Sequence, residues 1–245
     1  MAIQAVSGER TKKRSRRHQR HSWLRRIARV LVCAAALVLL SIVVFRFVNP
    51  PITPVMLVEK LKGNTLRRDW VPLKEISPQL PIAVIASEDG RFCAHWGVDW
   101  GAVREVVNQG GGLMNAVRGA STIPMQTAKN LYLWNGRSWV RKVLEVPLAY
   151  VISFVWPKQR MMEVYLNVAQ FGPGIFGAEA ASQYYFHKSA SALTRHEAVM
   201  LAVALPNPRF RNPARQSRRA LIVAKAVERR MPIMAARSVC VAPQQ

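Results

Sequence analysis

The stretch around which this sequence is organised runs Ala86-Ser-Glu-Asp-Gly-Arg-Phe-Cys-Ala-His-Trp-Gly-Val-Asp99. Two acids in it, Glu88 and Asp89, follow directly after an apolar run that begins at Leu80. A carboxylate at the edge of an apolar element loses hydration, which raises its pKa toward the range that a general base requires. An ordinary helix-end acid paired with Arg91 is the alternative. The stretch therefore predicts a buried helix and nominates Glu88 as a catalytic carboxylate.

Helical patterns surround this stretch. Residues 50–80 form a proline-bearing connector, and residues 101–120 have a loose composition around Gly110-Gly111-Gly112. Elsewhere capping residues precede apolar runs, and prolines or glycines follow them, as at helix ends. We see neither alternating strand runs nor internal repeats, so we predict an all-α fold. The expected helices span residues 80–88, 123–133 (capped by Thr122), 139–156 (capped by Ser138, kinked at Pro147), 157–168, 195–205 (capping box of Thr194 and Glu197) and 213–230.

Two further clusters hold side chains that could do chemistry. Residues 119–130 place hydroxyls, an amide and Lys129 along a helix start, where backbone N–H groups also favour anions. The other cluster consists of Arg137, Arg141, Lys142 and Glu145. Arg141 and Glu145 are helical i,i+4 neighbours, so a surface ion pair explains them. The functional alternative is that Arg141, Lys142 and Lys129 form a cationic site for an anionic group, with Glu145 orienting them or holding a metal.

The charge balance is strongly basic. The chain has 36 Lys and Arg against 13 Asp and Glu, a formal net charge of +23. This balance favours a polyanionic partner, such as an anionic membrane surface, a phosphorylated substrate or nucleic acid. Zinc-finger spacing and an RNA-binding aromatic signature are missing, so we expect no nucleic acid. For any single cation, a solvated basic surface is the simpler explanation.

An apolar segment from Ile27 to Val48 is interrupted by only three polar residues. Its length matches the roughly 20 residues that cross a bilayer core. Residues 1–29 hold ten Lys and Arg against one acid, so the positive-inside rule keeps the N-terminus in the cytoplasm. A cleaved signal peptide is the alternative, but the segment is long and its end lacks the small residues of a cleavage site. We expect a basic cytoplasmic tail over 1–26, a transmembrane signal anchor over 27–48 and an outer domain over 49–245.

The three cysteines, Cys33, Cys93 and Cys240, lack metal-ligand spacing. A disulfide between Cys93 and Cys240 is compatible with an oxidising compartment. A nucleophilic Cys93 beside His95 is another interpretation, although such pairs are neighbours in space rather than in sequence. The sequence leaves both open.

In their order, these segments resemble the peptidoglycan glycosyltransferases, specifically the monofunctional biosynthetic form. The resemblance covers roughly residues 55–215. No Ser-x-x-Lys motif of the penicillin-binding type occurs and little chain follows the fifth motif, so no transpeptidase domain is expected. Pro124-Met125 replaces the polar residues that usually precede the apolar residue of the second motif, and Pro147 follows the third; both could alter helix geometry and lower activity. The five motifs span residues 86–99, 119–130, 141–145, 158–177 and 197–208.

The resemblance implies a lysozyme-like, mainly α-helical domain in the periplasm, anchored in the inner membrane, that polymerises lipid II. Glu88 would take the proton of the acceptor sugar's 4-hydroxyl, which displaces undecaprenyl pyrophosphate from the growing chain with inversion. Lys129, Arg141 and Lys142 would face that pyrophosphate. Glu145 would position these cations or hold a divalent metal, Mg²⁺ or Mn²⁺. No organic cofactor is expected. The other expected substrate contacts are Asp89, Phe92 and His95, with packing an equal interpretation for Phe92, and Ser121, Thr122, Gln126 and Asn130.

The expected partners are lipid II, the growing glycan chain, the bilayer, and division or elongation proteins. Residues 101–120, with Val106, Val107, Leu113, Met114 and Val117, would lie in the membrane interface and admit the lipid, or form a solvent loop. Two other functions stay open. A lytic glycan-cleaving enzyme would share helices and carboxylates but has no need of the cationic cluster. An inactive membrane-anchored scaffold is the second, and the intact Glu88 and Glu145 argue against it.

Overall fold

The computed structural model describes residues 3–109, 121–136 and 138–242, with residues 3–22 described by their backbone alone. The chain divides into two units, one ending at Phe45 and the other beginning at Arg46. The expectations for Arg137 and for residues 110–120, with Leu113, Met114 and Val117, lie outside the described residues.

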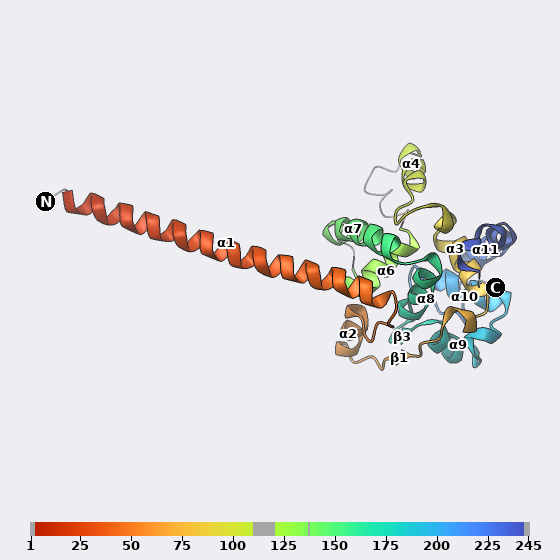
Figure 1. The fold of residues 1–245 in the computed structure, drawn as a ribbon. Helices are drawn as coiled ribbons and strands as arrows, with labels where there is room; N and C mark the ends of the chain where they lie inside the picture. Colours follow the sequence, from red (N-terminus) through yellow and green to blue (C-terminus); the bar gives the residue numbers. More distant parts are fainter. Residues whose placement is uncertain (1–2, 110–120, 137, 243–245) are drawn as a thin grey trace. The chain divides into compact units, whose positions relative to one another are not determined.

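The first unit is one long helix, α1 (Ile3–Phe45), drawn from red to orange in Figure 1. Among the described residues, a single segment, Trp23–Phe45, is long and apolar enough to cross a membrane. Its large apolar side chains, such as Leu31 and Leu37, are exposed, because no other part of this unit packs against them. The helix is the candidate membrane anchor, and it ends three residues before Val48, where the apolar run ends.

The second unit is built mainly of helices, which confirms the predicted all-α class (Figure 1). Its helices are α2 (Pro54–Leu61), α3 (Gln79–Glu88), α4 (Trp100–Asn108), α6 (Ile123–Tyr132), α7 (Trp139–Val155), α8 (Lys158–Val168), α9 (Ala178–Phe186), α10 (Arg195–Ala204) and α11 (Arg218–Arg237). Short 3₁₀ turns are η1 (Leu73–Glu75), η2 (Phe92–Ala94), η3 (Ala190–Ala192) and η4 (Val239–Val241).

Helices α3 and α10 pack together and form one side of the core, with α11 also against α3. On α3, Leu80, Val84 and Ile85 are buried, and on α10 every residue from Ala198 to Ala204 is buried. A helix that is apolar on nearly all sides must be covered on all sides. The end of α3, where Glu88 lies, is thereby held inside the domain.

Helix α8 lies at the centre of the other side, against α6, α7 and α9. Its apolar residues are fully buried, and its polar residues fasten the connector that precedes α3. The Asn167 side chain accepts from Val71 N (3.0 Å) and donates to Val71 O (2.8 Å). Glu163 Oε2 accepts from Leu73 N at 2.9 Å. These two polar residues of the fourth motif therefore serve the fold, because they satisfy backbone groups that would otherwise be unpaired.

A small sheet was not predicted. Its strands are β1 (Arg67–Arg68), β2 (Gln170–Gly172) and β3 (Ile175–Phe176), in the order β1-β3-β2, with β1 parallel and β2 antiparallel to β3. Strands of two or three residues are too short to show an alternating pattern. The turn expected at 171–174 joins β2 to β3, and a Cβ at Gly174 would lie 2.3 Å from Thr65 O, so only glycine fits there.

Helices α2 and α9 were not predicted, and two other segments differ clearly from the predictions. Residues 101–120 were expected to be loose, but residues 100–108 form α4, because the Asp99 side chain accepts from Ala102 N and caps the helix. Its Val103 packs in a cluster with Met125 and Ala149. The last helix was expected over 213–230 and instead runs from 218 to 237, capped by Ser217.

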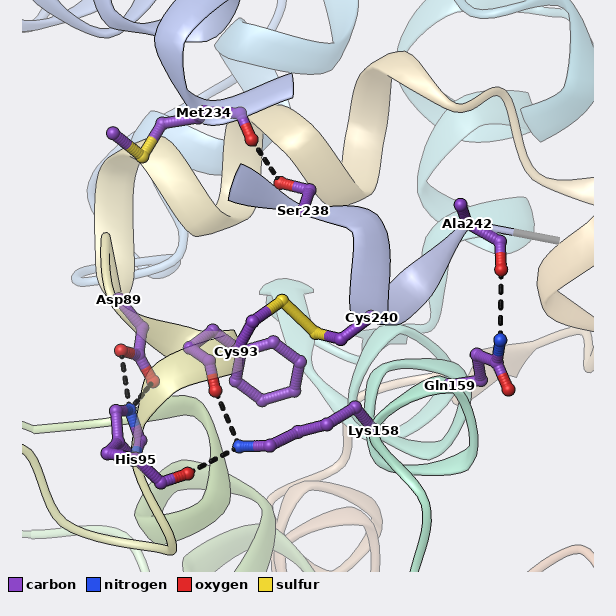
Figure 2. The surroundings of a disulfide bond; sticks show 10 residues. Asp89, Cys93, His95, Lys158, Gln159, Met234, Ser238, Cys240 and Ala242 are labelled. Atoms are coloured by element: carbon purple, nitrogen blue, oxygen red, sulfur yellow. Dashed lines mark hydrogen bonds and ion pairs between the residues drawn. A yellow bond between two sulfur atoms is a disulfide. The ribbon is translucent and has the colours of Figure 1, made fainter. Parts of the chain in front are cut away.

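Cys93 and Cys240 form a disulfide between η2 and η4, shown in Figure 2, with their Cα atoms 5.7 Å apart. The open alternative of a nucleophilic Cys93 is therefore wrong, because its sulfur is bonded. Cys33 is a free thiol.

Candidate active site

Glu88 is the last residue of α3, and two side chains hold its carboxylate. Ser87 Oγ donates to Oε1 at 3.1 Å, and Gln126 Nε2 donates to Oε2 at 2.9 Å. The side chain is partly accessible to solvent, yet the surrounding protein removes enough hydration to raise the pKa of Glu88 above its ordinary value of 4.5. The hydrogen bonds from Gln126 and Ser87 oppose that rise. The raised pKa makes this carboxylate a better proton acceptor than an exposed glutamate, and its partial exposure leaves it in reach of a substrate.

Tyr165 on α8 is a residue that the sequence analysis missed. Its hydroxyl donates to Gln126 Oε1 at 3.0 Å, which turns the amide so that Nε2 faces Glu88. Tyr165 is fully buried, and burial raises its pKa well above 10, so the hydroxyl keeps its proton. Its position within the fourth motif was a signal, but no local pattern pairs it with Gln126.

Asp89 joins the end of α3 to the start of α6. It is buried, and its Oδ2 accepts from the backbone N–H of Ile123 at 2.9 Å. His95 Nε2 lies 2.8 Å from Asp89 Oδ1. Asp89, the neighbour of Glu88 in the chain, is thus engaged by protein groups, and contact of Asp89 or His95 with a substrate stays a prediction.

Phe92 is fully buried, which favours packing over substrate contact for this residue. Lys158, the first residue of α8, has its ammonium 4.4 Å from the centre of the Phe92 ring. The same ammonium donates to the backbone carbonyls of Phe92 and His95, as Figure 2 shows. Burial lowers the pKa of Lys158 to about 8, and the negative charge of Asp89 partly opposes this.

The cationic cluster on α7 is assembled around Glu145. This carboxylate is fully buried, and Arg141 Nη1 lies 2.6 Å from Oε1 while Lys142 Nζ lies 2.9 Å from Oε2. Lys142 also donates to Ser121 Oγ at 2.9 Å, just before α6 begins. The surface ion pair is therefore the wrong interpretation, since all three charged side chains are largely buried and form one network.

Lys129 on α6 interacts electrostatically with both Glu88 and the cluster around Glu145. Burial is the main cause that lowers its pKa, followed by the positive charge of Arg141. The negative charges of Glu145 and Glu88 act in the opposite direction. No carboxylate within 4 Å pairs with Lys129 in the part of the chain that the structure describes. A partly desolvated cation with no such partner is suited to bind an anionic ligand.

Glu145 does not fit a metal site. Both of its oxygens already lie against Arg141 and Lys142, so a divalent cation there would have to displace one of them. The described residues also contain no group of three His, Cys, Asp or Glu side chains that could hold a metal ion. The arrangement instead makes Glu145 a counter-ion that positions two cations.

The remaining expected contacts lie on or next to α6. Thr122 caps this helix by accepting from Met125 N, and its hydroxyl donates to Gly97 O, so it serves the fold. Asn130 is buried on the same helix. Pro124 lies in the first turn, where a helix tolerates proline, and Gln126 still reaches Glu88. Pro147 lies inside α7, which continues to Val155.

Arg211 is a second residue that the sequence analysis missed. Its positive charge favours the ionised form of Glu88 and so lowers the pKa of that carboxyl, although desolvation outweighs it. Its guanidinium donates to Val203 O at 2.7 Å, which anchors it to the end of α10. It follows the fifth motif in an irregular segment with no spacing that would have marked it.

A partly accessible carboxylate, Glu88, and a cluster of cations are linked by one helix, α6, in a helical domain that follows a candidate membrane anchor. These features define a class of glycosyl-transferring enzymes that act on a lipid-linked phosphorylated donor. The chain belongs to the transglycosylase family, whose model matches residues 55–233.

Three similar proteins from different bacteria share one name. The chain is 49% identical over 193 residues to the biosynthetic peptidoglycan transglycosylase of Pasteurella multocida, covering 75% of this chain and 77% of the relative. The protein of the same name from Agrobacterium fabrum is 52% identical over 181 residues, covering 74% and 79%. That from Rhodospirillum centenum is 48% identical over 214 residues, covering 86% and 91%.

Proposed function

We propose that this protein is a peptidoglycan glycosyltransferase that polymerises lipid II into glycan strands, with Glu88 as its general base. The observation that carries the proposal is the position of α6. Its Gln126 holds Glu88, and its Lys129 interacts electrostatically with both Glu88 and the Arg141–Lys142–Glu145 cluster. Membership of the transglycosylase family supports glycan polymerisation in cell wall synthesis.

In the proposed reaction, the Glu88 carboxylate takes the proton from the 4-hydroxyl of the acceptor sugar. The hydroxyl oxygen then forms a bond to the anomeric carbon of the lipid-linked growing chain. The bond from that carbon to the pyrophosphate oxygen breaks with its electron pair, which inverts the configuration from α to β. Because desolvation raises its pKa, Glu88 is a stronger base than an exposed glutamate.

The leaving undecaprenyl pyrophosphate concentrates negative charge, and the cationic side chains would stabilise it. Glu145 holds Arg141 and Lys142 in place, while Lys129 is left to face the phosphates. Fixed cations in a partly dry site need little reorganisation during the reaction, which is why such groups lower activation barriers.

A divalent metal is not required at Glu145 in this proposal. We propose that any Mg²⁺ or Mn²⁺ enters with the pyrophosphate of the substrate, and that no organic cofactor takes part. The Mg²⁺ dependence of wild type beside that of Glu145→Gln tests this, because only a metal held by Glu145 would make the two dependences differ.

The proposal places the catalytic domain in the periplasm, tethered to the inner membrane by Trp23–Phe45. The substrate's lipid tail stays in the bilayer, so a tethered domain meets it more often than a free one would. The Cys93–Cys240 disulfide supports a periplasmic position of the domain, since disulfides persist in oxidising compartments. Division or elongation proteins are the proposed protein partners, which co-purification from solubilised membranes would test.

The lytic alternative is not favoured. A glycan hydrolase gains nothing from a buried cationic cluster, whereas departure of a pyrophosphate does. The decisive assay is polymerisation of labelled lipid II by the detergent-solubilised protein, with and without Mg²⁺, beside Glu88→Gln. We expect wild type to make glycan strands and the variant to make none while it unfolds at the same temperature. Degradation of purified sacculi without polymerisation, or substantial activity of Glu88→Gln, would contradict the proposal.

A further inference from the structure

The disulfide joins two parts of the chain that are 147 residues apart. Cys93 lies in η2, five residues after Glu88, and Cys240 lies in η4, after the last helix. The proposed reaction uses neither cysteine. The bond nevertheless anchors the segment that carries Asp89 and His95 to the C-terminal end of the described chain (Figure 2).

Lys158 holds the same segment from α8. Its ammonium donates to the carbonyls of Phe92 and His95, so it joins both ends of η2. Gln159, the next residue of α8, donates to Ala242 O at 2.9 Å and so ties the C-terminal segment to the same helix. Residues 92–95 are thus held covalently through Cys93 and by hydrogen bonds through Lys158.

Contacts lead from this segment to Glu88. The His95 ring bonds to Asp89, and Asp89 accepts from Ile123 N at the start of α6. Three residues further along α6, Gln126 donates to the Glu88 carboxylate. A displacement of residues 92–95 would move His95 and would loosen Asp89 from α6. It would thereby change the position of Gln126 relative to Glu88.

We propose that Cys93, Cys240 and Lys158 are positioning residues for the polymerisation reaction, holding residues 92–95 so that His95 and Asp89 keep α6 in register with Glu88. The inference rests on the proposed function for its kinetic consequence. Its structural consequence does not depend on that function. Breaking the disulfide is expected to slow the chemical step more than it weakens substrate binding, because misplacement by about an ångström costs rate in a preorganised site.

The test uses the full-length, detergent-solubilised protein in its oxidised and its dithiothreitol-reduced form. Maleimide labelling under denaturing conditions should find one thiol before reduction, Cys33, and three after it. We expect reduction to lower kcat by roughly tenfold with KM changed by less than about twofold, and reoxidation to restore kcat. Three thiols before reduction, or a kcat unchanged by reduction, would overturn the proposal, even if the unfolding temperature falls.

Three variants separate positioning from general stability. Lys158→Met keeps the alkyl chain but removes the donors, and it should lower kcat as reduction does. Gln159→Ala removes the neighbouring bond to Ala242 and should keep the wild-type kcat. Cys33→Ala should keep the full response to reduction. A wild-type kcat for Lys158→Met, or an equal loss in Gln159→Ala, would contradict the assignment.

Hydrogen exchange gives a measurement without substrate. Amides of residues 89–95 and of the first turn of α6 should exchange faster after reduction, whereas those of α10 should not change. If oxidised wild type fails to polymerise lipid II, the proposed function is wrong and exchange alone decides the positioning role. Unchanged exchange in 89–95 would refute that role whatever the activity.

Discussion

Gln126 donates its side-chain amide to Glu88 at 2.9 Å, although the two residues are 38 positions apart in the sequence. The bond links the end of α3 to the first half of α6. The same helix carries Lys129 less than one turn later, and Ser121, just before the helix, accepts from Lys142. Helix α6 is therefore the element that relates the proposed base to the proposed pyrophosphate site.

Replacing Gln126 with Ala should shift the pH dependence of polymerisation. The amide stabilises the ionised carboxylate, so its loss raises the pKa of Glu88 further. The reaction needs ionised Glu88, and the acidic limb of kcat/KM should therefore move to higher pH. Gln183→Ala removes a similar bond, from Gln183 Nε2 to Glu179 on α9, and should leave the profile in place. A shift to lower pH in Gln126→Ala would contradict the role of this bond.

Lys129→Met should lose activity without losing stability. Removing one group that stabilises developing charge typically costs about 100-fold in kcat. Burial disfavours the charge of Lys129, so a neutral side chain of similar shape should leave the unfolding temperature equal or higher. Lys74→Met, at an exposed lysine of η1, is the control and should change neither quantity. A large fall in unfolding temperature would indicate that Lys129 is structural.

Glu145→Ala should destabilise the domain by about 3–5 kcal/mol, because two largely buried cations would lose their counter-ion. Urea denaturation measures this loss. Glu145→Gln keeps a hydrogen-bond acceptor and should cost less. The residual activity of Glu145→Gln should depend on Mg²⁺ as that of wild type does. A changed metal dependence would mean that Glu145 holds a metal after all.

Acid should remove a contribution of Asp99 to stability. Arg91 pairs with this carboxylate and lowers its pKa from 3.8 to about 2. A folded-state pKa below the unfolded one means that the stabilisation is complete above pH 4 and is lost as the pH falls toward 2. Asp99→Asn should flatten the slope of unfolding free energy in that window, as measured by thermal unfolding at several pH values. An unchanged slope would show that the Arg91–Asp99 pair contributes nothing to the free energy of unfolding. Ion pairs with a half-exposed partner such as Arg91 often contribute little.

Many of the helices followed from the sequence because their signals are local. Thr122 caps α6, and Thr194 with Glu197 makes the capping box of α10, through bonds that span only three residues. The apolar run before Glu88 predicted a buried α3 for the same reason. The strands β1 and β3 could not be predicted, since Arg67 and Ile175 pair across more than 100 residues and neither strand has a pattern of its own.

The sequence by itself predicted the acids Glu88 and Glu145 and the cations Lys129, Arg141 and Lys142, but it did not reveal Tyr165 or Arg211. Only the tertiary structure decided how they are paired. Tyr165 orients Gln126 across 39 residues, and Cys93 meets Cys240 across 147. Such contacts depend on the packing of α6 and η4 against α8. That packing is set by buried surface summed over the whole domain and leaves no signal at the residues that it brings together.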